Sequence, residues 1–469
     1  MRVPAGVAAG HPATAEVGLR VLESGGTAAD AGVAAVLAAC VAETIFTGLG
    51  GGGYATYFEA STGRVTCLDF FVAAPGLDGD RKAEPMTPIA VRFGDVPLPY
   101  EIGGASVAVP GVPAGCGEIH ARWGRLPWAE VVAPAVELAR TGTAMPQAHA
   151  VTLPALVEAM LPGDGGPAYA PGGRLLRGGD RLHHPGLADA LAIIAEEGPG
   201  TCYTGKIGAS IVESVRADGG ALGPLDLSAY RVAEREVTTA PLAGRTVLGR
   251  ADLNRTVETL RGLPPELPGL SHPERAVVLA NALDVRGPDD RLGDTTNVTA
   301  VDPAGNACVI TTTLGLGSGV WLPGLGVHLN SMLGEGELYS GDLPPGERLA
   351  SMMCPLVVLD PTGALHLAVG SAGASRIRSA LLTTLVGILI DDLPTSDAVC
   401  APRLHPVDDV VHVEPHYPLP DEMALTEAGY AVNRWPTRSH YFGGVSAIGT
   451  AGAAGDPRRG GTSRLLPTP

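Results

Sequence analysis

The feature that most constrains the fold of this chain is a helix-length stretch that has no polar face. Residues 28–41 read AADAGVAAVLAACV and follow Thr27, a residue type that commonly caps helices. The pattern predicts a helix that is apolar nearly all round and is therefore buried on every side. Its uncharged part, 31–42, is too short to span a bilayer, as is the apolar stretch 380–390. The sequence therefore predicts a layered fold that encloses this helix.

Other helices and strands are predicted from period and turn residues. Two strands are expected at 54–59 and 64–70, and a hairpin is expected from residue 296, where NVTAVDPAGNACVITTTLG joins two apolar runs by a turn. Further helices are predicted at 12–23, 115–123, 128–140, 187–196, 207–217, 273–283 and 375–390. Residues 74–104 and 251–294 are expected to be mainly loop. The fold class is α+β, one compact core with a sandwich of sheets between helices.

Composition narrows the range of partners. The chain has 49 acidic and 32 basic residues, a net charge of −17, which argues against nucleic acid or a membrane surface. The N-terminus has no sustained apolar segment of the secretory type, so a cytoplasmic location is expected. Seven cysteines without CxxC spacing are interpreted as small buried residues in a reducing compartment.

Three familiar kinds of site are not supported by the sequence. The glycine-rich run 48–53 follows a predicted helix and precedes a strand, which is the reverse of a dinucleotide-binding fingerprint, so it is interpreted as a close-packed wall. The twelve histidines show no metal-ligand spacing, and no GxSxG motif is present. No metal or organic cofactor is expected.

The segment 293–319 suggests one specific chemistry. It begins GDTTNVTAV, with two threonines at the head of a predicted strand. In N-terminal-nucleophile hydrolases, cleavage before such a threonine frees an α-amine that acts as base for the threonine hydroxyl. An α-amine with a pKa of about 7.7–8.0 is suited to that task near neutral pH. Taken alone the pattern is weak, because threonine is also a common strand residue.

Motifs along nearly the whole chain resemble those of the γ-glutamyltransferase (γ-glutamyltranspeptidase) family. They occur in the family's order: HPATAEVGLRVLESGGTAADAGVAA, GLGGGGYATYFEASTGRVTCLDF, SVAVPGVPAG, WGRLPWAEVVAPAVELARTG, TTNVTAVDPAGNACVITTTLG, GVHLNSML, RLASMMCPLVV, GSAGASRIRSALL and APRLHP. The resemblance implies a four-layer αββα N-terminal-nucleophile fold. It also implies a precursor that is cut between Asp294 and Thr295 into a large segment, 1–294, and a small segment, 295–469.

The resemblance assigns catalytic roles to four residues. Thr295 is expected to be the nucleophile, with its freed amine as general base. Thr313 corresponds to a second threonine that hydrogen-bonds the nucleophile. The backbone N–H groups of Gly373 and Ala374 are expected to form the oxyanion hole, where the family has two glycines. The glycine run 48–53 is expected to form a wall near the nucleophile.

The departures from the family pattern concern the substrate. Phe71 replaces the arginine that holds the glutamyl α-carboxylate, which makes a γ-glutamyl donor doubtful. A Ser-Ser pair reads Ala350-Ser351, and the usual histidine after the threonine pair is Asn297. The positions that would receive the α-amine are Gly315, Met332 and Glu335, of which only Glu335 retains a suitable side chain.

The expected function is that of an autoprocessing threonine hydrolase or acyltransferase with a non-standard acyl donor. The partners expected are a small-molecule substrate and the two fragments of the precursor, and a homo-oligomer is left open. One alternative is a C–C bond hydrolase of alkyl-proline antibiotic biosynthesis that releases an oxalyl unit. Another is a true γ-glutamyltransferase that uses Arg376 or Arg348 as the carboxylate clamp. Two weaker alternatives are a non-catalytic scaffold and an oxidoreductase or kinase built on the glycine run.

Overall fold

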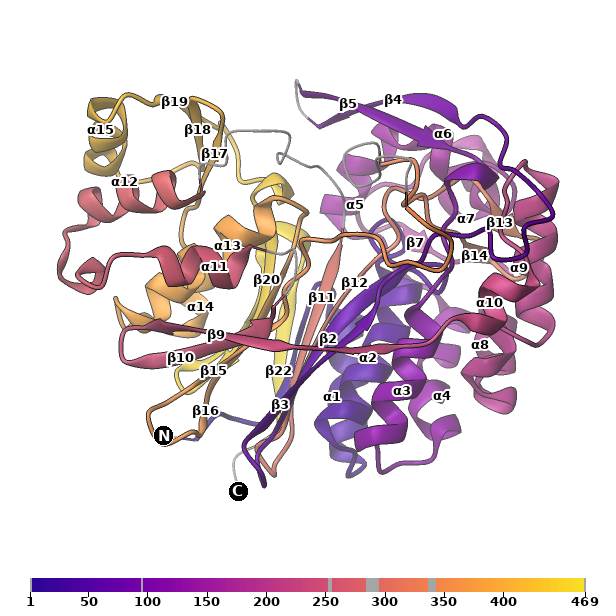
Figure 1. Cartoon of the computed structure of the whole chain (residues 1–469), viewed down its shortest axis with the longest axis horizontal. Coiled ribbons are helices and arrows are strands. Elements are labelled where there is room, and N and C mark those ends of the chain that lie inside the picture. The colour runs from indigo at the N-terminus through magenta and orange to yellow at the C-terminus, as the bar shows by residue number, and fades with distance from the viewer. Residues whose placement is uncertain (1, 94–95, 252–254, 284–294, 336–342, 468–469) are drawn as a thin grey trace.

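The computed structural model has two β-sheets stacked face to face, with helices on both outer faces (Figure 1). It describes residues 2–93, 96–251, 255–283, 295–335 and 343–467. The predicted four-layer αββα architecture of the α+β class is confirmed.

The first sheet has seven strands in the order β22-β1-β11-β12-β2-β3-β8. The strands are β1 (Gly6–Ala9), β2 (Gly52–Glu59), β3 (Arg64–Phe70), β8 (Ala233–Arg235), β11 (Thr296–Val301), β12 (Ala307–Thr313) and β22 (Thr462–Leu465). All of its neighbouring pairs are antiparallel. The chain on either side of residue 295 thus contributes strands to one sheet.

The second sheet has six strands in the order β21-β20-β16-β15-β10-β9. They are β9 (Val237–Leu242), β10 (Arg245–Arg250), β15 (Leu356–Leu359), β16 (Leu365–Ala372), β20 (Gly444–Gly449) and β21 (Gly452–Gly455). Smaller sheets are formed by β4 (Thr87–Phe93) with β5 (Val96–Ile102), β6 (Thr143–Ala144) with β7 (Arg181–Leu182), β13 (Trp321–Leu322) with β14 (Val327–His328), and β17 (Leu404–Val407), β18 (Val410–Val413) and β19 (Ala431–Arg434).

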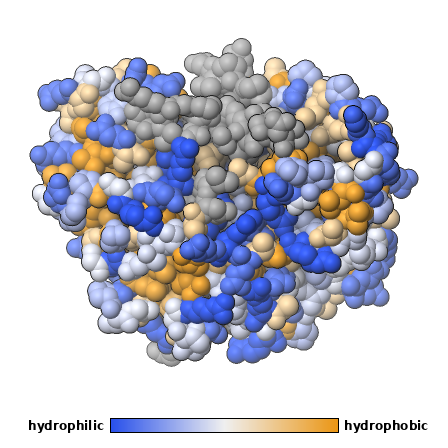
Figure 2. Space-filling view, viewed as in Figure 1, coloured by the Kyte–Doolittle hydropathy of each residue, from blue (hydrophilic) through white to orange (hydrophobic). Residues whose placement is uncertain are grey.

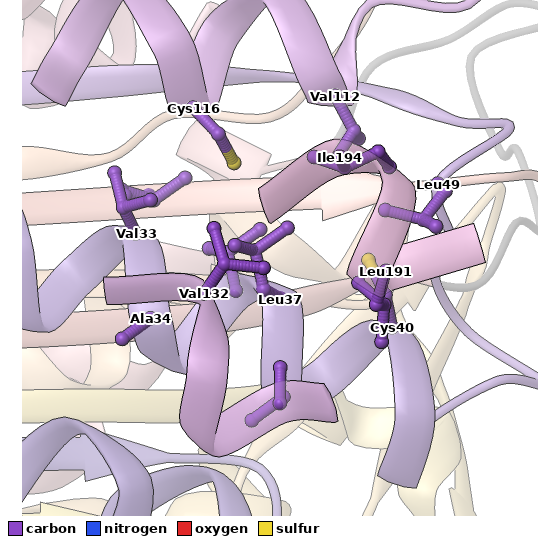
Figure 3. Packing of buried hydrophobic residues seen from close by; sticks show 14 of the residues in the cluster. Val33, Ala34, Leu37, Cys40, Leu49, Val112, Cys116, Val132, Leu191 and Ile194 are labelled. Atoms are coloured by element: carbon purple, nitrogen blue, oxygen red, sulfur yellow. The ribbon is translucent and has the colours of Figure 1, made fainter. Parts of the chain in front are cut away.

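Helix α2 (Ala28–Ala42) lies at the centre of the outer layer on the first sheet, and every one of its residues is buried. Thr27 and Asp30 cap its N-terminus reciprocally. Figure 3 shows Leu37 and Cys40 packed among residues of neighbouring helices. This layer also contains α1 (Pro12–Glu23), α3 (Val112–Trp123), α4 (Trp128–Thr141) and α8 (Leu187–Glu197). The prediction of a helix buried on all sides is therefore confirmed.

The outer face of the second sheet is covered by α11 (Thr256–Gly262), α13 (Arg376–Leu389) and α14 (Thr395–Cys400). Beyond them lie α12 (His272–Leu283) and α15 (Leu419–Glu427), at the upper left of Figure 1. The remaining helices are α5 (Gln147–Thr152), α6 (Val157–Met160), α7 (Gly165–Tyr169), α9 (Lys206–Ala217) and α10 (Pro224–Ala229). Within the described ranges, no helix is long and apolar enough to cross a membrane.

The two sheets enclose a core of small apolar side chains, and alternation along the strands decides which residues enter it. In β11, Val298 and Ala300 pack with the helices on the outer face, whereas Val301 packs in the core between the sheets. Thr299 lies on this inner face too, where its hydroxyl donates to the Ser446 carbonyl of β20 at 2.9 Å. By the same period of two, Thr295 and Asn297 belong to the inner face.

Most predicted helices and strands are present with ends shifted by a few residues, but two loop predictions are wrong. The segment 74–104 contains the hairpin β4–β5, whose prolines at 88, 97 and 99 concealed it. This two-stranded ribbon lies apart from the main sheets, where proline is tolerated. Helix α11 interrupts the other predicted loop, 251–294. No disulfide joins the seven cysteines, all of which lie in the described ranges, and six of them are buried. On the face shown in Figure 2, apolar residues form separate patches among hydrophilic ones.

Candidate active site

A pocket with an empty volume of about 320 Å³ brings together residues from distant parts of the chain. Its lining residues are Phe71, Thr295, Thr313, Met332, Glu335, Ser351, Met352, Met353, Ala374 and Ile377. Seven of these ten were named from the sequence, and the three others, Met352, Met353 and Ile377, are apolar neighbours of named positions. The predicted site residues therefore converge, although they are spread over three hundred residues of sequence.

Strand register explains why Thr295, Thr313 and Phe71 meet. Asn297 pairs with Thr311 in the β11–β12 ladder, and continuing this register sets Thr295 opposite Thr313. Thr313 in turn pairs with Gly52 of β2. The next ladder pairs Gly53 with Phe70, so Gly52 stands opposite Phe71. The three side chains therefore come from one row that crosses four adjacent strands.

The glycine run allows strand β2 to approach its neighbours closely at this row of residues. A Cβ atom on Gly52 would lie 3.0 Å from the Phe71 Cα and 2.7 Å from the backbone nitrogen of Val72, so any side chain there would displace β3. A Cβ on Gly51 would collide with the Thr313 carbonyl oxygen. The run 48–53 lies beside Thr313, which separates it from Thr295, and close backbone packing is the reason for its glycines.

The two threonines are buried, and Thr313 is held by a local bond. Thr295 and Thr313 are 3% and 5% exposed. The Thr313 hydroxyl accepts a hydrogen bond from the Gly315 N–H at 3.0 Å. The Thr295 carbonyl accepts one from Arg459 Nη1, also at 3.0 Å. Asp294 lies outside the described residues.

The Gly373–Ala374 turn connects β16 to α13 at the edge of the pocket. Gly373 has φ of +118° and Ala374 has φ of +49°, so both adopt conformations that L-residues with side chains disfavour. A Cβ on Gly373 would lie 2.9 Å from the Gly443 Cα, which excludes a larger residue. Among the bonds formed within the described ranges, neither of these two amide N–H groups is a donor. Ala374 lines the pocket and Gly373 is set behind it.

Glu335 supplies the charged end of the pocket. It is 8% exposed, and its Oε1 accepts a hydrogen bond from the Tyr100 hydroxyl at 2.9 Å. Tyr100 also contacts Ser331 Oγ at 2.8 Å and accepts from the Leu316 N–H at 3.0 Å. Burial first, and then the Glu335 carboxylate, raises the pKa of Tyr100 well above its usual value, so the hydroxyl keeps its proton and donates. Tyr100 lies on the unpredicted strand β5.

Gly315 lies against the same group of polar side chains. A Cβ on this glycine would lie 2.7 Å from the Tyr100 hydroxyl and 3.0 Å from Glu335 Oε1. Gly315 is therefore adjacent to the acidic group but does not line the pocket. Its φ of +70° is a second reason for glycine at this position.

The apolar walls of the pocket are supported by a buried arginine. The Phe71 ring stacks on Tyr54 with centroids 5.7 Å apart. The guanidinium carbon of Arg250 lies 3.7 Å from the Tyr54 ring centroid, and Arg250 also donates to the carbonyls of Ser351 and Met353. Arg250 thus fixes both the segment 351–353, which lines the pocket, and the Tyr54 ring, which stacks on Phe71.

Several residues considered from the sequence lie outside the lining. Ala350 does not reach the pocket. Arg348 is ion-paired with Asp69 at 3.6 Å, and Arg376 packs over the Tyr441 ring at 4.2 Å. The Asn297 side chain is bound within the sheet, where its Oδ1 accepts from the Thr311 hydroxyl at 2.7 Å. Among the described lining residues, Glu335 carries the single charge. In the part of the chain that the structure describes, no three His, Cys, Asp or Glu residues are grouped to hold a metal.

Comparisons with known proteins place the chain in a family. The chain matches the gamma-glutamyltranspeptidase family over residues 14–253 and 272–465. It is 29% identical to the acylase ACY 1 proenzyme of Pseudomonas sp. (strain SE83), covering 94% of this chain and 89% of the relative. It is 27% identical to the glutathione hydrolase 5 proenzyme of Rattus norvegicus, covering 97% and 92%.

The fold has a close match among solved structures. The cephalosporin acylase of Bacillus halodurans superimposes with a TM-score of 0.80 at 21% identity, covering 100% of this chain and 97% of that one. At this identity the likeness concerns the fold, which is that of the N-terminal-nucleophile hydrolases. Together with the family match over most of its length, it shows that this chain is an enzyme that belongs to the gamma-glutamyltranspeptidase family.

Proposed function

We propose that this enzyme is an autoprocessing threonine hydrolase that cleaves amides of a largely apolar acyl group. Cleavage between Asp294 and Thr295 frees the α-amine of Thr295. That amine takes the proton from Thr295 Oγ as Oγ attacks the acyl carbonyl, and returns it to the leaving amine. Water then attacks the acyl-enzyme, with the same amine as base. The relatives at 27–29% identity are proenzymes by name, which supports this sequence of events.

The tetrahedral intermediate of each step needs donors for its oxyanion. The amides of Gly373 and Ala374 are suited to this role because Ala374 lines the pocket together with Thr295, Gly373 directly precedes it, and the turn between β16 and α13 fixes both. Loss of one such donor typically slows an acyl transfer by two to three orders of magnitude, roughly 10²–10³-fold. Because the donors belong to the backbone, alanine in place of the family's second glycine preserves them.

The composition of the pocket carries the proposal on substrate class. Around the threonine pair, most of the lining residues are apolar, and the polar ones are Ser351 and the charged Glu335. The apolar residues are Phe71, Met332, Met352, Met353, Ala374 and Ile377. An α-carboxylate in this pocket would be desolvated beside an anion and would lack a described cation, at a cost of several kcal/mol. An amino or N–H group would instead find the Glu335 carboxylate. We therefore expect an acyl chain that is apolar near the carbonyl and ends in a donor or a cation.

The alternatives identified from the sequence are anionic donors. A γ-glutamyl group has an α-carboxylate, and an oxalyl unit released by C–C hydrolysis is itself a carboxylate. Neither Arg348 nor Arg376 is in the lining, which disfavours both donors. The acylase relative at 29% identity supports an amide substrate.

A matched set of substrates tests the proposal. Intact mass under denaturing conditions first establishes whether the 47.6 kDa chain is cut before Thr295. The p-nitroanilides of γ-glutamate, 4-aminobutanoate, glutarate and butanoate then present the same chain with both charged groups, the amine alone, the carboxylate alone or neither. We expect kcat/KM for 4-aminobutanoyl to exceed that for γ-glutamyl by at least about tenfold, equivalent to about 1.4 kcal/mol. Preference for γ-glutamyl or glutaryl, or release of oxalate from an oxalyl donor, would contradict it.

A further inference from the structure

Arg459 contacts Thr295 but is not among the residues that line the pocket. It ends the short turn 457–459 between β21 and β22 and is 4% exposed. Its Nη1 donates to the Thr295 carbonyl oxygen at 3.0 Å. Arg459, which is 164 residues away in the sequence, thus holds Thr295, the nucleophile of the proposed function.

The same guanidinium adjoins the proposed oxyanion turn. A Cβ on Gly373 would lie 3.4 Å from Arg459 Nη2, and one on Gly444 would collide with the arginine side chain. The guanidinium carbon also packs over the Phe46 ring, 4.6 Å from its centroid. Arg459 is therefore packed between Thr295, the 373–374 turn and the helix layer, and its position leaves little freedom.

Three histidines in this region have pKa values shifted toward the neutral form. Burial, followed by the charge of Arg459, lowers the pKa of His440 to about 3. Burial and nearby positive charge likewise lower the pKa of His149 well below its usual value. Burial also lowers the pKa of His11, against the opposing effect of Glu43.

The carboxylates near this arginine accept hydrogen bonds from other groups. Asp456, which caps the turn that carries Arg459, accepts from Arg403 at 2.6 Å and from Arg458 at 3.2 Å. Glu43 accepts from the Thr14 hydroxyl at 2.7 Å and from the Thr296 hydroxyl, on the helix side of β11. Glu335 accepts from Tyr100 across the pocket. Arg459 itself donates to the Thr295 carbonyl.

We propose, building on the proposed function, that Arg459 is a positioning residue that fixes Thr295 by its carbonyl and favours the neutral, proton-accepting form of its freed α-amine. The amine and the carbonyl belong to the same residue, so the guanidinium is a near neighbour of any ammonium formed there. A like charge at that distance disfavours protonation. Arg459 itself transfers no proton, because a guanidinium stays charged throughout.

The step that benefits is the attack. The lone pair of the α-amine accepts the Thr295 Oγ proton while the Oγ–carbon bond forms and the carbonyl π electrons move to oxygen. The ammonium then returns this proton to the leaving nitrogen as the carbon–nitrogen bond breaks. A resting enzyme whose amine is already protonated cannot begin this sequence.

The test compares pH profiles of Arg459→Gln, Arg459→Lys and Arg458→Gln. Arg458 is the matched control, since it is adjacent and buried but donates to Glu414 and Asp456. Each variant is assayed on the best substrate of the set above, and rates are normalised to the fraction that intact mass shows to be cleaved. In Arg459→Gln the acidic limb of kcat/KM should move to higher pH by about half a unit to one unit, and kcat should fall by at least about tenfold.

Arg459→Lys retains the charge but not the planar fork, so its acidic limb should stay near the wild-type position while kcat falls. Arg458→Gln should be less stable but should keep the wild-type limb. An unchanged limb in Arg459→Gln, or equal shifts in all three variants, would overturn the proposal. The variant Thr295→Ala separates this outcome from failure of the proposed function. If Thr295→Ala remains active, both proposals fail. If it is inactive, the pH profiles test the role of Arg459 independently of the proposed function.

Discussion

At the scale of single residues, Phe71 is the change that most alters the pocket relative to the family pattern. The substitution Phe71→Arg would introduce a guanidinium into the lining of the pocket that contains Thr295. We expect the ratio of γ-glutamyl to 4-aminobutanoyl turnover to rise by about tenfold or more, because the α-carboxylate gains a partner. The stability of the free enzyme should fall, because the new guanidinium would be buried near that of Arg250, which packs on the neighbouring Tyr54 ring.

Phe71→Leu is the matched control for this experiment. It keeps the wall apolar, so the substrate ratio should stay within about twofold, while stability falls by about 1 kcal/mol through imperfect packing. The ratio comes from steady-state kinetics on the two p-nitroanilides, and stability comes from urea unfolding. A ratio that rises equally in both variants would show that space, and not charge, sets the preference.

Ala374 carries a second prediction at this scale. Its φ of +49° is a left-handed conformation, which costs an L-residue about 1 kcal/mol and glycine little. Ala374→Gly should therefore leave kcat/KM within about twofold and change stability by less than about 1 kcal/mol in either direction, because the gained flexibility offsets the relieved strain. Ala374→Val should lose both stability and kcat. A large loss in the glycine variant would mean that the alanine methyl group, which lines the pocket, contacts the substrate.

The residues of the site differ in how far the sequence could reveal them. Thr295, Thr313 and Phe71 could be predicted because motif spacing and strand register set them in one row. Tyr100 could not, because the prolines around it concealed strand β5. Arg459 lies in a Gly- and Pro-rich turn near the C-terminus, and only the folding of β22 beside β1 brings that turn to the active site.

At the scale of elements, a buried ionic cluster joins the second sheet to the loops around α14. Asp456 accepts from Arg403 at 2.6 Å and from Arg458 at 3.2 Å, and Arg458 also pairs with Glu414. All four side chains are at most 5% exposed. Asp456 further accepts from the backbone N–H groups of Val445 and Arg458, so it connects β20 to the turn that carries Arg459.

This cluster makes stability depend on pH in a definite direction. Burial alone would raise the pKa of Asp456, but Arg403 and Arg458 outweigh it, so the pKa lies below its usual value. A carboxyl whose folded pKa is lowered stabilises the protein above its unfolded pKa of about 3.9, and this stabilisation is lost as pH falls through the folded value. Asp456→Asn should cost about 3–5 kcal/mol at neutral pH, because the buried guanidinium group of Arg403 loses its carboxylate partner and that of Arg458 loses one of two.

Urea unfolding at several pH values between neutral and acidic conditions measures this effect. The difference between wild type and Asp456→Asn should be constant near neutral pH and shrink below about pH 4. The surface variant Glu16→Gln, whose pair with Arg20 is exposed, serves as control and should differ from wild type by less than about 1 kcal/mol. A difference that stays constant down to acidic pH would show that the loss arises from packing and not from charge.

Helices and strands whose own residues show a clear pattern of apolar and polar positions were predictable. Strands whose burial depends on the elements packed against them were not. Helices α1 and α8 each present one apolar face to the core, and β3 follows a clear turn and becomes buried after its second residue, so each was found within a residue of its ends. Strands β9 and β10 were missed because their exposed and buried residues do not alternate cleanly.

At the scale of the whole molecule, the segments 1–294 and 295–469 are interleaved. In the first sheet β1 lies between β11 and β22, and β12 pairs with β2. In the second sheet β15 pairs with β10. Each sheet is thus assembled from both segments, and the core between the sheets takes Phe58 from one and Val309 from the other. Separating the segments would expose this core and break the ladders along their length, so neither segment is a folding unit by itself.

Cleavage before Thr295 should therefore leave the molecule intact. We expect the two fragments to elute together in native size-exclusion chromatography, and to separate only in denaturant. Wild type and the uncleaved variant Thr295→Ala should elute at the same volume, because cutting one peptide bond breaks no strand pairing. Urea unfolding of the cleaved enzyme should show one transition that shifts to higher urea with protein concentration, since the unfolded fragments are independent molecules, whereas the uncleaved variant should show no such shift. Fragments that separate without denaturant would contradict the interleaved architecture as the source of stability.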